Sequence, residues 1–297
     1  MSALAPRAVF VTRETDYELL LARRATREQA RFFLESRGQH LSWVEERHNR
    51  FQATLQAART KVPPNWRQAH VRRADLDRFL FSPEDVVVIV GQDGLVPNVA
   101  KYLSGQPVVG VNPLPDVYDG VLVRATVDDL EVILGATFAG DVRVEHRTMA
   151  EARLDNGERL LALNELYIGH RSHQSARYEI RINKAAEDQS SSGIICATGT
   201  GATGWARSIM EAIHAELVLS PEDRALAFFV REPFPSISTG TSIRFGKLES
   251  DSLTITSRMN EGGVIFADGI EKDFVAFDWG RQLMVKIAQQ SLRLVVP

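Results

Sequence analysis

Apolar residues in the first part of this chain fall into buried strand runs and helical stripes. The continuous apolar run at 85–90 (DVVVIV) is typical of a strand buried on both faces of a parallel sheet. The stretches 8–12 (AVFVT) and 107–112 (PVVGVN) predict two more strands. Apolar positions at three- and four-residue spacing over 26–60 predict helix, with a break near Gly38. Because strands and helices alternate, we expect a layered α/β domain.

After about residue 122 the pattern changes. Short runs there alternate apolar and polar positions, with turns between them, which is typical of antiparallel strands. Residues 206–217 are the one clear helix expected in this part. The fold class predicted is therefore an α/β N-terminal domain with a mostly parallel sheet, over 1–122, followed by a β-rich second domain over 123–275.

Composition narrows the class of protein. The chain has 297 residues, 44% hydrophobic and 25% charged, with a net charge of −3, so nothing global indicates a nucleic-acid partner. The single cysteine, Cys196, excludes an internal disulfide framework and fits a reducing compartment. Charges interrupt the N-terminal apolar stretches, and no run approaches the roughly 18 apolar residues of a membrane span. We expect a cytoplasmic protein without a membrane partner.

The first 80 residues are rich in basic side chains, with 15 Lys and Arg against 9 Asp and Glu. A solvated helix face explains such an excess in most proteins. The alternative is a basic rim that attracts phosphates.

The turn that follows the apolar run at 85–90 is the first candidate for chemistry. Gly91 and Gly94 allow a ligand to approach the backbone, and the N–H groups at the start of the next helix favour phosphate. Asp93 would repel a phosphate unless it accepts a proton from an attacking hydroxyl or holds a divalent cation. A helix cap or a self-satisfied turn explains the same pattern without a function.

A glycine- and threonine-rich segment, 191–209, is the second candidate. A short apolar strand leads into Thr198, Thr200, Gly201 and Thr203, and Trp205 then opens a helix. Small residues leave room for a ligand at the main chain, hydroxyl groups can bond it, and the indole can stack on a flat ring. The alternative is a glycine-rich connection beside a core tryptophan.

Two further positions interrupt apolar strands. Asn164 and Glu165 are adjacent, so at least one of them is expected to face inward, where it needs a polar partner such as a ribose diol or a purine amine. An edge strand that faces solvent is the alternative. The Asp-Gly pair at 268–269, taken alone, predicts a hairpin turn.

The motifs, and the order in which they follow one another along the chain, resemble those of the NAD kinase family. The turn at 91–94 corresponds to the family's Gly-Gly-Asp-Gly, and Asn164–Glu165 to its Asn-Glu or Asn-Asp pair. Ser192 and the following glycine correspond to an Asp-Gly strand that leads into Thr-Pro-Thr-Gly-Ser-Thr-Ala-Tyr, here 198–205, and Asp268 to a late Asp-Gly turn. The resemblance runs from about residue 84 to the end.

The resemblance implies a function and the residues that perform it. The family uses ATP and a divalent cation, Mg²⁺ or another, to phosphorylate the 2′-hydroxyl of the adenosine ribose of NAD(H). It also implies a homo-oligomer, a dimer or a tetramer, and a C-terminal tail, about 276–297, that packs back on the first domain. Asp93 would then be the general base or hydroxyl-positioning carboxylate. The remaining residues that it implies bind phosphate (Gly91, Gln92, Gly94) or substrate (Asn164, Glu165, Ser192, Thr198, Thr200, Gly201, Thr203, Trp205).

The chain departs from the family pattern at several positions, among them Leu95 in place of a threonine and Gly199 in place of a proline. Gln92 replaces a glycine, Ser192 replaces an aspartate near the substrate, and Ala202 replaces a serine. The departures motivate one alternative, a non-catalytic NAD(P)-binding regulatory protein. The Gly-Gly-Asp-Gly turn, shared with diacylglycerol and sphingosine kinases, motivates another, a kinase with a lipid or other small-molecule acceptor.

Overall fold

The computed structural model describes residues 6–297. The N-terminal stretch that was considered for a signal peptide begins with five residues outside this range. The chain forms two compact units. Unit 1 comprises the residues up to Glu145 together with Arg293–Pro297, and unit 2 comprises His146–Leu292. The division predicted at residue 122 assigned 123–145 to the second domain. In the structure these residues include a helix that packs in the core of unit 1.

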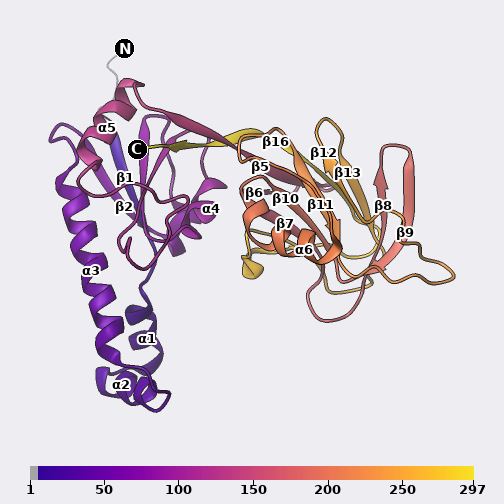
Figure 1. Ribbon diagram of the computed structural model, residues 1–297, viewed down its shortest axis with the longest axis horizontal. Helices are drawn as coiled ribbons and strands as arrows, with labels where there is room; N and C mark the ends of the chain where they lie inside the picture. Colours follow the sequence, from indigo (N-terminus) through magenta and orange to yellow (C-terminus); the bar gives the residue numbers. More distant parts are fainter. Residues whose placement is uncertain (1–5) are drawn as a thin grey trace. The chain divides into compact units, whose positions relative to one another are not determined.

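Unit 1 is built on a parallel sheet (Figure 1). β1 pairs on one side with β2 and on the other with β3, and β3 pairs with β4. Two residues near the chain's end, Arg293 and Leu294 of β16, add to β4 in the same direction. The strands of this sheet are β1 (Arg7–Thr12), β2 (Arg67–Arg72), β3 (Asp85–Val90), β4 (Pro107–Val111) and the end of β16 (Gln282–Val295).

Helices lie on both faces of this sheet. All six residues of β3 are buried, as the apolar run predicted. Its residues Val86 and Val88 pack with the C-terminal half of α3 (Leu41–Thr60) and with α5 (Leu130–Ala139). Figure 1 shows α4 (Leu95–Ala100) on the other side of the sheet from α3. A 3-10 turn, η1 (Arg73–Arg78), contacts α4. The predicted mostly parallel α/β domain is confirmed.

The N-terminal half of α3 extends beyond the sheet and carries two short helices, α1 (Asp16–Arg24) and α2 (Arg27–Glu35) (Figure 1). A small apolar cluster that includes Ala30, Leu34 and Leu41 joins the three. The break predicted near Gly38 is confirmed, because that glycine has a φ of +70° between α2 and α3. The sequence pattern did not predict α1.

Unit 2 consists of two mostly antiparallel sheets with an apolar core between them. One sheet has the order β12-β11-β10-β7-β14-β15. In the other, β16 pairs with β13, β13 with β8, and β8 with β9, while β5 pairs with β16 and β6. The predicted β-rich second part is confirmed. The strands are β5 (Val144–Leu154), β6 (Arg159–Ala162), β7 (Glu165–His170), β8 (Ala176–Ile182), β9 (Ala185–Ser191), β10 (Ile194–Thr198), β11 (Leu226–Val230), β12 (Phe245–Leu248), β13 (Leu253–Ser257), β14 (Gly263–Ala267) and β15 (Val275–Ala276).

One helix, α6 (Trp205–Ile213), follows β10 after a short 3-10 turn, η2 (Gly201–Thr203). Apolar residues of α6 pack against the sheet that contains β10 and β7. The helix ends four residues before the predicted position, because His214 adopts a left-handed conformation with a φ of +53°. A last 3-10 turn, η3 (Glu271–Asp273), follows β14.

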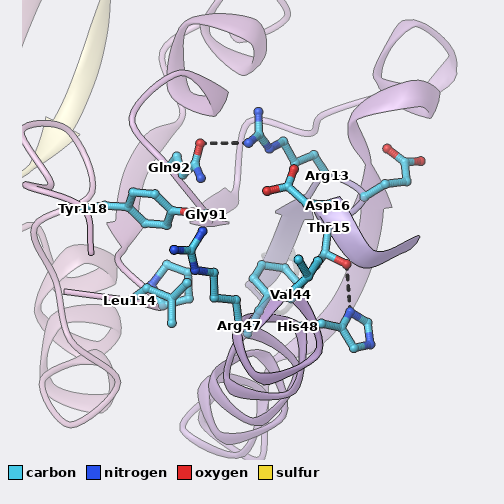
Figure 2. Close-up of a pocket in the computed structure, with 13 residues that line it drawn as sticks. Arg13, Thr15, Asp16, Val44, Arg47, His48, Gly91, Gln92, Leu114 and Tyr118 are labelled. Atoms are coloured by element: carbon cyan, nitrogen blue, oxygen red, sulfur yellow. Dashed lines mark hydrogen bonds between the residues drawn. The ribbon is translucent and has the colours of Figure 1, made fainter. Parts of the chain in front are cut away.

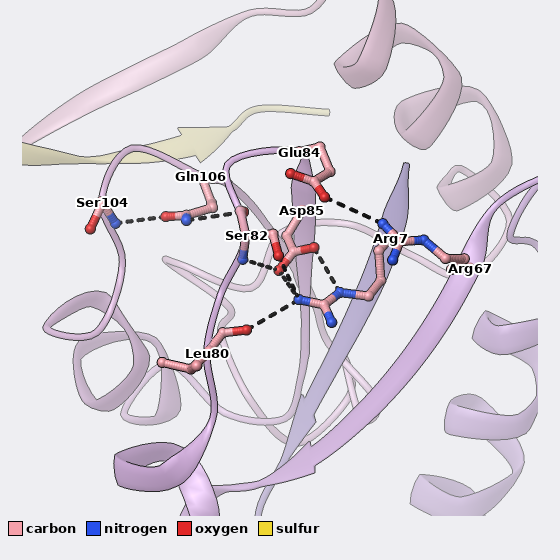
Figure 3. A network of polar contacts seen from close by, with 8 residues as sticks. All are labelled: Arg7, Arg67, Leu80, Ser82, Glu84, Asp85, Ser104 and Gln106. Atoms are coloured by element: carbon pink, nitrogen blue, oxygen red, sulfur yellow. Dashed lines mark hydrogen bonds and ion pairs between the residues drawn. The ribbon is translucent and has the colours of Figure 1, made fainter. Parts of the chain in front are cut away.

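A buried ion pair fixes the amino ends of the two central strands of unit 1 (Figure 3). The Arg7 guanidinium donates to both oxygens of Asp85, at 2.8 and 2.6 Å, and the Asp85 side chain is fully buried. The Ser82 N–H also donates to this carboxylate. Hydrogen bonding to Asp85 raises the pKa of Arg7 further above its usual value. The pair lies at the sheet edge opposite the turn at 91–94.

Removing Arg7 leaves the fully buried Asp85 carboxylate without its ion partner. We expect Arg7→Met to lower the free energy of unfolding by about 3–5 kcal/mol, the usual cost of breaking a buried pair. The double variant Arg7→Met/Asp85→Leu should recover most of this loss, because it removes both charges. Urea unfolding measures both changes. Equal losses in the single and double variants would show that the two charges are not coupled.

Candidate functional site

The turn at 91–94 begins at the carboxyl end of β3, as predicted, and the helix that follows it is only six residues long. The Leu95 N–H donates to the Gln92 carbonyl and the Val96 N–H to the Asp93 carbonyl. The prediction that the N–H groups at the helix start are free for phosphate is therefore wrong for these two. Within residues 6–297, the N–H groups of Gln92, Asp93 and Gly94 in this turn donate to no backbone carbonyl. An added Cβ at Gly94 would meet no atom within 4 Å, so this side of the turn is open.

The Asp93 carboxylate accepts three backbone N–H groups from one loop. Oδ1 accepts from Leu122 and Val123 at 2.7 and 3.1 Å, and Oδ2 accepts from Val121 at 2.9 Å. A carboxylate has about four acceptor positions, so one stays available on Oδ2. The loop comes this close because position 110 is a glycine, where a Cβ would lie 2.3 Å from the Leu122 carbonyl oxygen. Asp93 therefore anchors a loop and can also accept one hydroxyl.

A small pocket lies beside the turn, bordered by two arginines (Figure 2). Arg13, the first residue after β1, donates from Nη2 to the Gln92 side-chain oxygen at 2.8 Å. Arg47 of α3 points into the same space. The basic composition of the first 80 residues favoured a solvated helix face, and a basic rim that attracts phosphates was the alternative. The sequence did contain one indication that Arg13 lies near the turn. Arg13 directly follows a predicted strand, and Gly91 directly follows the strand that is its neighbour in the sheet.

In unit 2 a second carboxylate positions the Asn-Glu pair. The Asp268 carboxylate accepts the backbone N–H groups of Leu163, at 3.2 Å, and Asn164, at 2.6 Å. The predicted turn at this aspartate is confirmed, because Asp268 and Gly269 both have positive φ and the Ile270 N–H donates back to the Ala267 carbonyl.

The glycine- and threonine-rich segment packs against the same corner. The buried Thr198 hydroxyl donates to the Leu163 carbonyl and accepts the N–H groups of Thr200 and Gly201. A Cβ at Gly201 would lie 2.1 Å from the Asn164 carbonyl oxygen. The sequence predicted that small residues here leave room for a ligand. In the structure Gly201 instead leaves room for the protein's own backbone at Asn164. Gly201 and Thr198 together hold Asn164 in place.

The environment of Glu165 changes its ionisation. Burial, and secondarily the negative charge of Asp268, raise the pKa of Glu165 to about 7. Near neutral pH this carboxyl is therefore present in both forms, so it can accept or donate a hydrogen bond to a bound hydroxyl.

Trp205 and Ser192 line a different pocket of unit 2, with a volume of about 600 Å³. The Trp205 ring stacks on Tyr167 with 6.1 Å between centroids and 10° between planes, and Tyr167 stacks on Phe266. The Arg231 guanidinium lies 5.2 Å from the centre of the Trp205 ring. The sequence analysis did not identify Tyr167, Phe266 and Arg231, which the fold brings to Trp205.

Two predicted residues of unit 2 remain, Thr200 and Thr203. Thr200 is buried, and its hydroxyl accepts a hydrogen bond from Arg147 at 3.4 Å. Thr203 is exposed, and its hydroxyl donates to the Thr200 carbonyl at 3.2 Å. Neither threonine lines the aromatic pocket.

The described residues contain no group of three or more His, Cys, Asp or Glu side chains arranged to hold a metal ion. In residues 6–297, none of the helices has the length and apolar content required to cross a membrane.

Curated relatives of this chain are NAD kinases. The chain is 35% identical to the NAD kinase of Heliobacterium modesticaldum over 153 residues, which is 46% of this chain and 52% of that protein. It is 25% identical to the NAD kinase of Chlorobaculum tepidum over 273 residues, which is 91% of this chain and 88% of that protein. The chain thus spans about half the length of the first relative and most of the second. A search with protein-family models found no match.

Solved structures share the fold. An NAD kinase from Archaeoglobus fulgidus in complex with ATP aligns over 98% of this chain and 93% of its own, with a TM-score of 0.60 and 18% identity. Yeast NADH kinase complexed with NADH aligns over 99% of this chain and 84% of its own, with a TM-score of 0.59 and 15% identity. The two-unit α/β and β-rich architecture is the fold of these nucleotide kinases. The chain is therefore similar to NAD kinases in sequence, and it shares the fold of these two structures.

The tight approach at Gly201 gives a direct test of the corner at Asn164. We expect Gly201→Ala to lower the melting temperature, because an added methyl group overlaps the Asn164 carbonyl and overpacking costs typically about 1–3 kcal/mol. Gly135→Ala in α5 is the matched control. Its Cβ meets no atom within 4 Å, so it should be neutral or stabilising by about 0.5–1 kcal/mol. Equal effects of the two substitutions on the melting temperature would contradict the packing seen at Gly201.

The raised pKa of Glu165 predicts a pH dependence of stability. The folded state holds this proton up to about pH 7, whereas the unfolded chain releases it near the usual glutamate pKa of 4.5. Ionisation of Glu165 therefore costs stability that is lost as pH rises between these values, by about 3 kcal/mol at most. Glu165→Gln should gain stability relative to the native protein between pH 5 and pH 8. Thermal unfolding of both proteins at the two pH values measures this, and an unchanged difference would refute the shift.

Proposed function

We propose that this protein is an ATP-dependent kinase that phosphorylates the 2′-hydroxyl of the adenosine ribose of NAD(H). In this reaction the hydroxyl oxygen forms a bond to the γ-phosphorus, and the bond from that phosphorus to the bridging oxygen of ADP breaks. The hydroxyl proton leaves with a base. The products are NADP(H) and ADP.

The observation that carries this proposal is the state of the Asp93 carboxylate. It is held by three backbone N–H groups, so its direction is fixed, and Oδ2 keeps one acceptor position. The free N–H groups of Gln92 and Gly94 stand beside it at the open side of the turn. Asp93 would position the hydroxyl and accept its proton. Gly91, Gln92 and Gly94 would bind phosphate.

Unit 2 would supply contacts for the acceptor nucleotide. Asn164 and Glu165 are held at their corner by Asp268 and Gly201, and they would bond the hydroxyl groups of a ribose. Trp205 and Ser192 border the aromatic pocket, which suits a flat ring. Thr198 acts here by holding Asn164, since its hydroxyl is buried among backbone groups.

The proposal includes three properties that follow from the family resemblance. The cation, Mg²⁺ or another divalent ion, would be bound mainly by the phosphates of ATP and would neutralise the charge that develops on them. The protein would act in the cytoplasm, and it would form a homo-oligomer, a dimer or a tetramer.

The two alternatives receive less support. A regulatory nucleotide-binding protein has no use for a fixed carboxylate with a spare acceptor position at the phosphate turn. A lipid acceptor has no counterpart among the named relatives, which are NAD kinases.

A coupled assay tests the function. Purified protein, ATP, Mg²⁺ and NAD or NADH are incubated, and an NADP-specific dehydrogenase measures the product. We expect NADP(H) from the native protein and a fall in kcat of about 100-fold or more for Asp93→Asn, since positioned acid–base groups contribute about 10²–10⁴-fold. Asp119→Asn, an exposed aspartate in the neighbouring loop, is the matched control and should keep its activity.

Binding separates a chemical role of Asp93 from a purely structural one. If Asp93 acts on the hydroxyl, Asp93→Asn should bind NAD(H) with nearly the native Kd while kcat falls. A parallel loss of binding, activity and melting temperature would instead show that Asp93 only anchors the loop. No NADP(H) from a native protein that binds NAD(H) would rule out the kinase function.

A further inference from the structure

The pocket beside the 91–94 turn has two basic side chains that no motif of the sequence assigned to a ligand. We propose that Arg13 and Arg47 bind the phosphate chain of the phosphoryl donor. That this ligand is the phosphoryl donor rests on the kinase function proposed above. The binding of a polyphosphate at the two arginines does not depend on that function.

The position of the pocket in the sheet is the first argument. From β1 the chain continues to β2 on one side of the sheet, whereas β3 and β4 follow on the other side. The strand order therefore reverses between β1 and β3. In open parallel sheets, ligands bind outside the carboxyl ends of the strands at this reversal. Arg13 follows the carboxyl end of β1, and Gly91 follows that of β3.

Arg13 spans this position directly. Its Nη2 donates to the Gln92 Oε1 at 2.8 Å, so a side chain from the end of β1 is joined to the turn after β3. A guanidinium has five N–H donors, and the bond to Gln92 uses one of them. Within residues 6–297, no carboxylate forms an ion pair with Arg13 or Arg47. Both arginines therefore keep donors for an anion.

Arg47 is held near the turn by its neighbours on α3. The next residue, His48, bonds the Thr15 hydroxyl at 2.7 Å, which ties α3 to the loop after β1. Glu45 accepts hydrogen bonds from Tyr17 and Arg27, which tie it to α1 and α2. Figure 2 shows the Arg47 guanidinium and the Tyr118 ring directed toward Gly91.

The charges around the pocket favour a phosphate that carries a cation. Glu14 and Asp16 also line the pocket, so two carboxylates oppose the two guanidinium groups. Arginine binds phosphate oxygens in bidentate pairs. Protein-bound Mg²⁺ is commonly held by one or two carboxylates together with substrate phosphates. In a metal-bound polyphosphate, the phosphate oxygens can bind the arginines and the cation can bind the carboxylates. A free anion would lie beside the two carboxylates with no cation to offset their negative charge.

The size of the pocket limits what it can hold. Its volume is about 70 Å³, far below the roughly 300–1,000 Å³ of pockets that enclose whole cofactors. It therefore accommodates phosphate groups and leaves the nucleoside outside. Inorganic tripolyphosphate should bind by the same contacts as the phosphates of ATP.

Isothermal titration of the full chain tests this assignment, with Mg-tripolyphosphate, Mg-ATP and NADH as separate probes. We expect Arg13→Gln and Arg47→Gln each to raise the Kd of both polyphosphates about tenfold, or about 1.4 kcal/mol. The Kd of NADH should stay unchanged. Arg59→Gln is the matched control, because Arg59 is an exposed arginine of the same helix outside the pocket. Circular dichroism and melting temperature verify folding.

The possible results separate this inference from the proposed function. An unchanged polyphosphate Kd in both variants, or an equal rise in Arg59→Gln, overturns the site. A rise in the NADH Kd instead assigns the arginines to the acceptor and also overturns it. If the native protein forms no NADP(H) but both variants weaken tripolyphosphate binding, the polyphosphate site stands and the kinase function falls.

Discussion

The three hydrogen bonds to the Asp93 carboxylate are the constraint on which the site of unit 1 depends. They join a turn after β3 to a loop that begins some 28 residues later, and they fix where the carboxylate points. The loop can only come so close because Gly110 lacks a Cβ. With Asp93 fixed in this way, the turn presents its free N–H groups and its one spare acceptor in a defined relation. Preorganised groups of this kind do not need to reorient when a ligand binds.

Unit 2 uses the same device at Asp268. Its carboxylate accepts two backbone N–H groups, and one of them belongs to Asn164. Gly201 and Thr198 complete the corner, through close backbone packing and through a buried hydroxyl. In both units the pattern of an acidic residue beside glycine therefore shapes the backbone first. Besides the spare acceptor position of Asp93, the side chains able to meet a ligand are neighbours such as Gln92 and Glu165.

The sequence predicted local features well and long-range ones poorly. The buried run of β3 and the alternation of the later strands follow from residue period, so they could be predicted. α5 was missed because its sequence is apolar on most sides and shows no clear period, and α1 was missed because none of its residues is buried. The partners of Asp93, Thr198 and Gly201 lie about 28–37 positions away, and pairings at that separation leave no local pattern. The order of the motifs identified the candidate residues. Only the fold showed which of them hold the backbone in place and which keep groups free for a ligand.

The departures from the family pattern leave the backbone of the candidate sites in place. Gln92 adds a side chain to the turn, yet the turn keeps its place, and the added amide oxygen accepts a bond from Arg13. Ser192 removes a carboxylate beside the aromatic pocket, where Arg231 lies against Trp205. Both positions therefore lie beside an arginine that lines a candidate pocket. Asp93 and Asp268 hold the backbone through bonds that do not involve the side chains of Gln92 or Ser192, so both turns keep their form with these departures present.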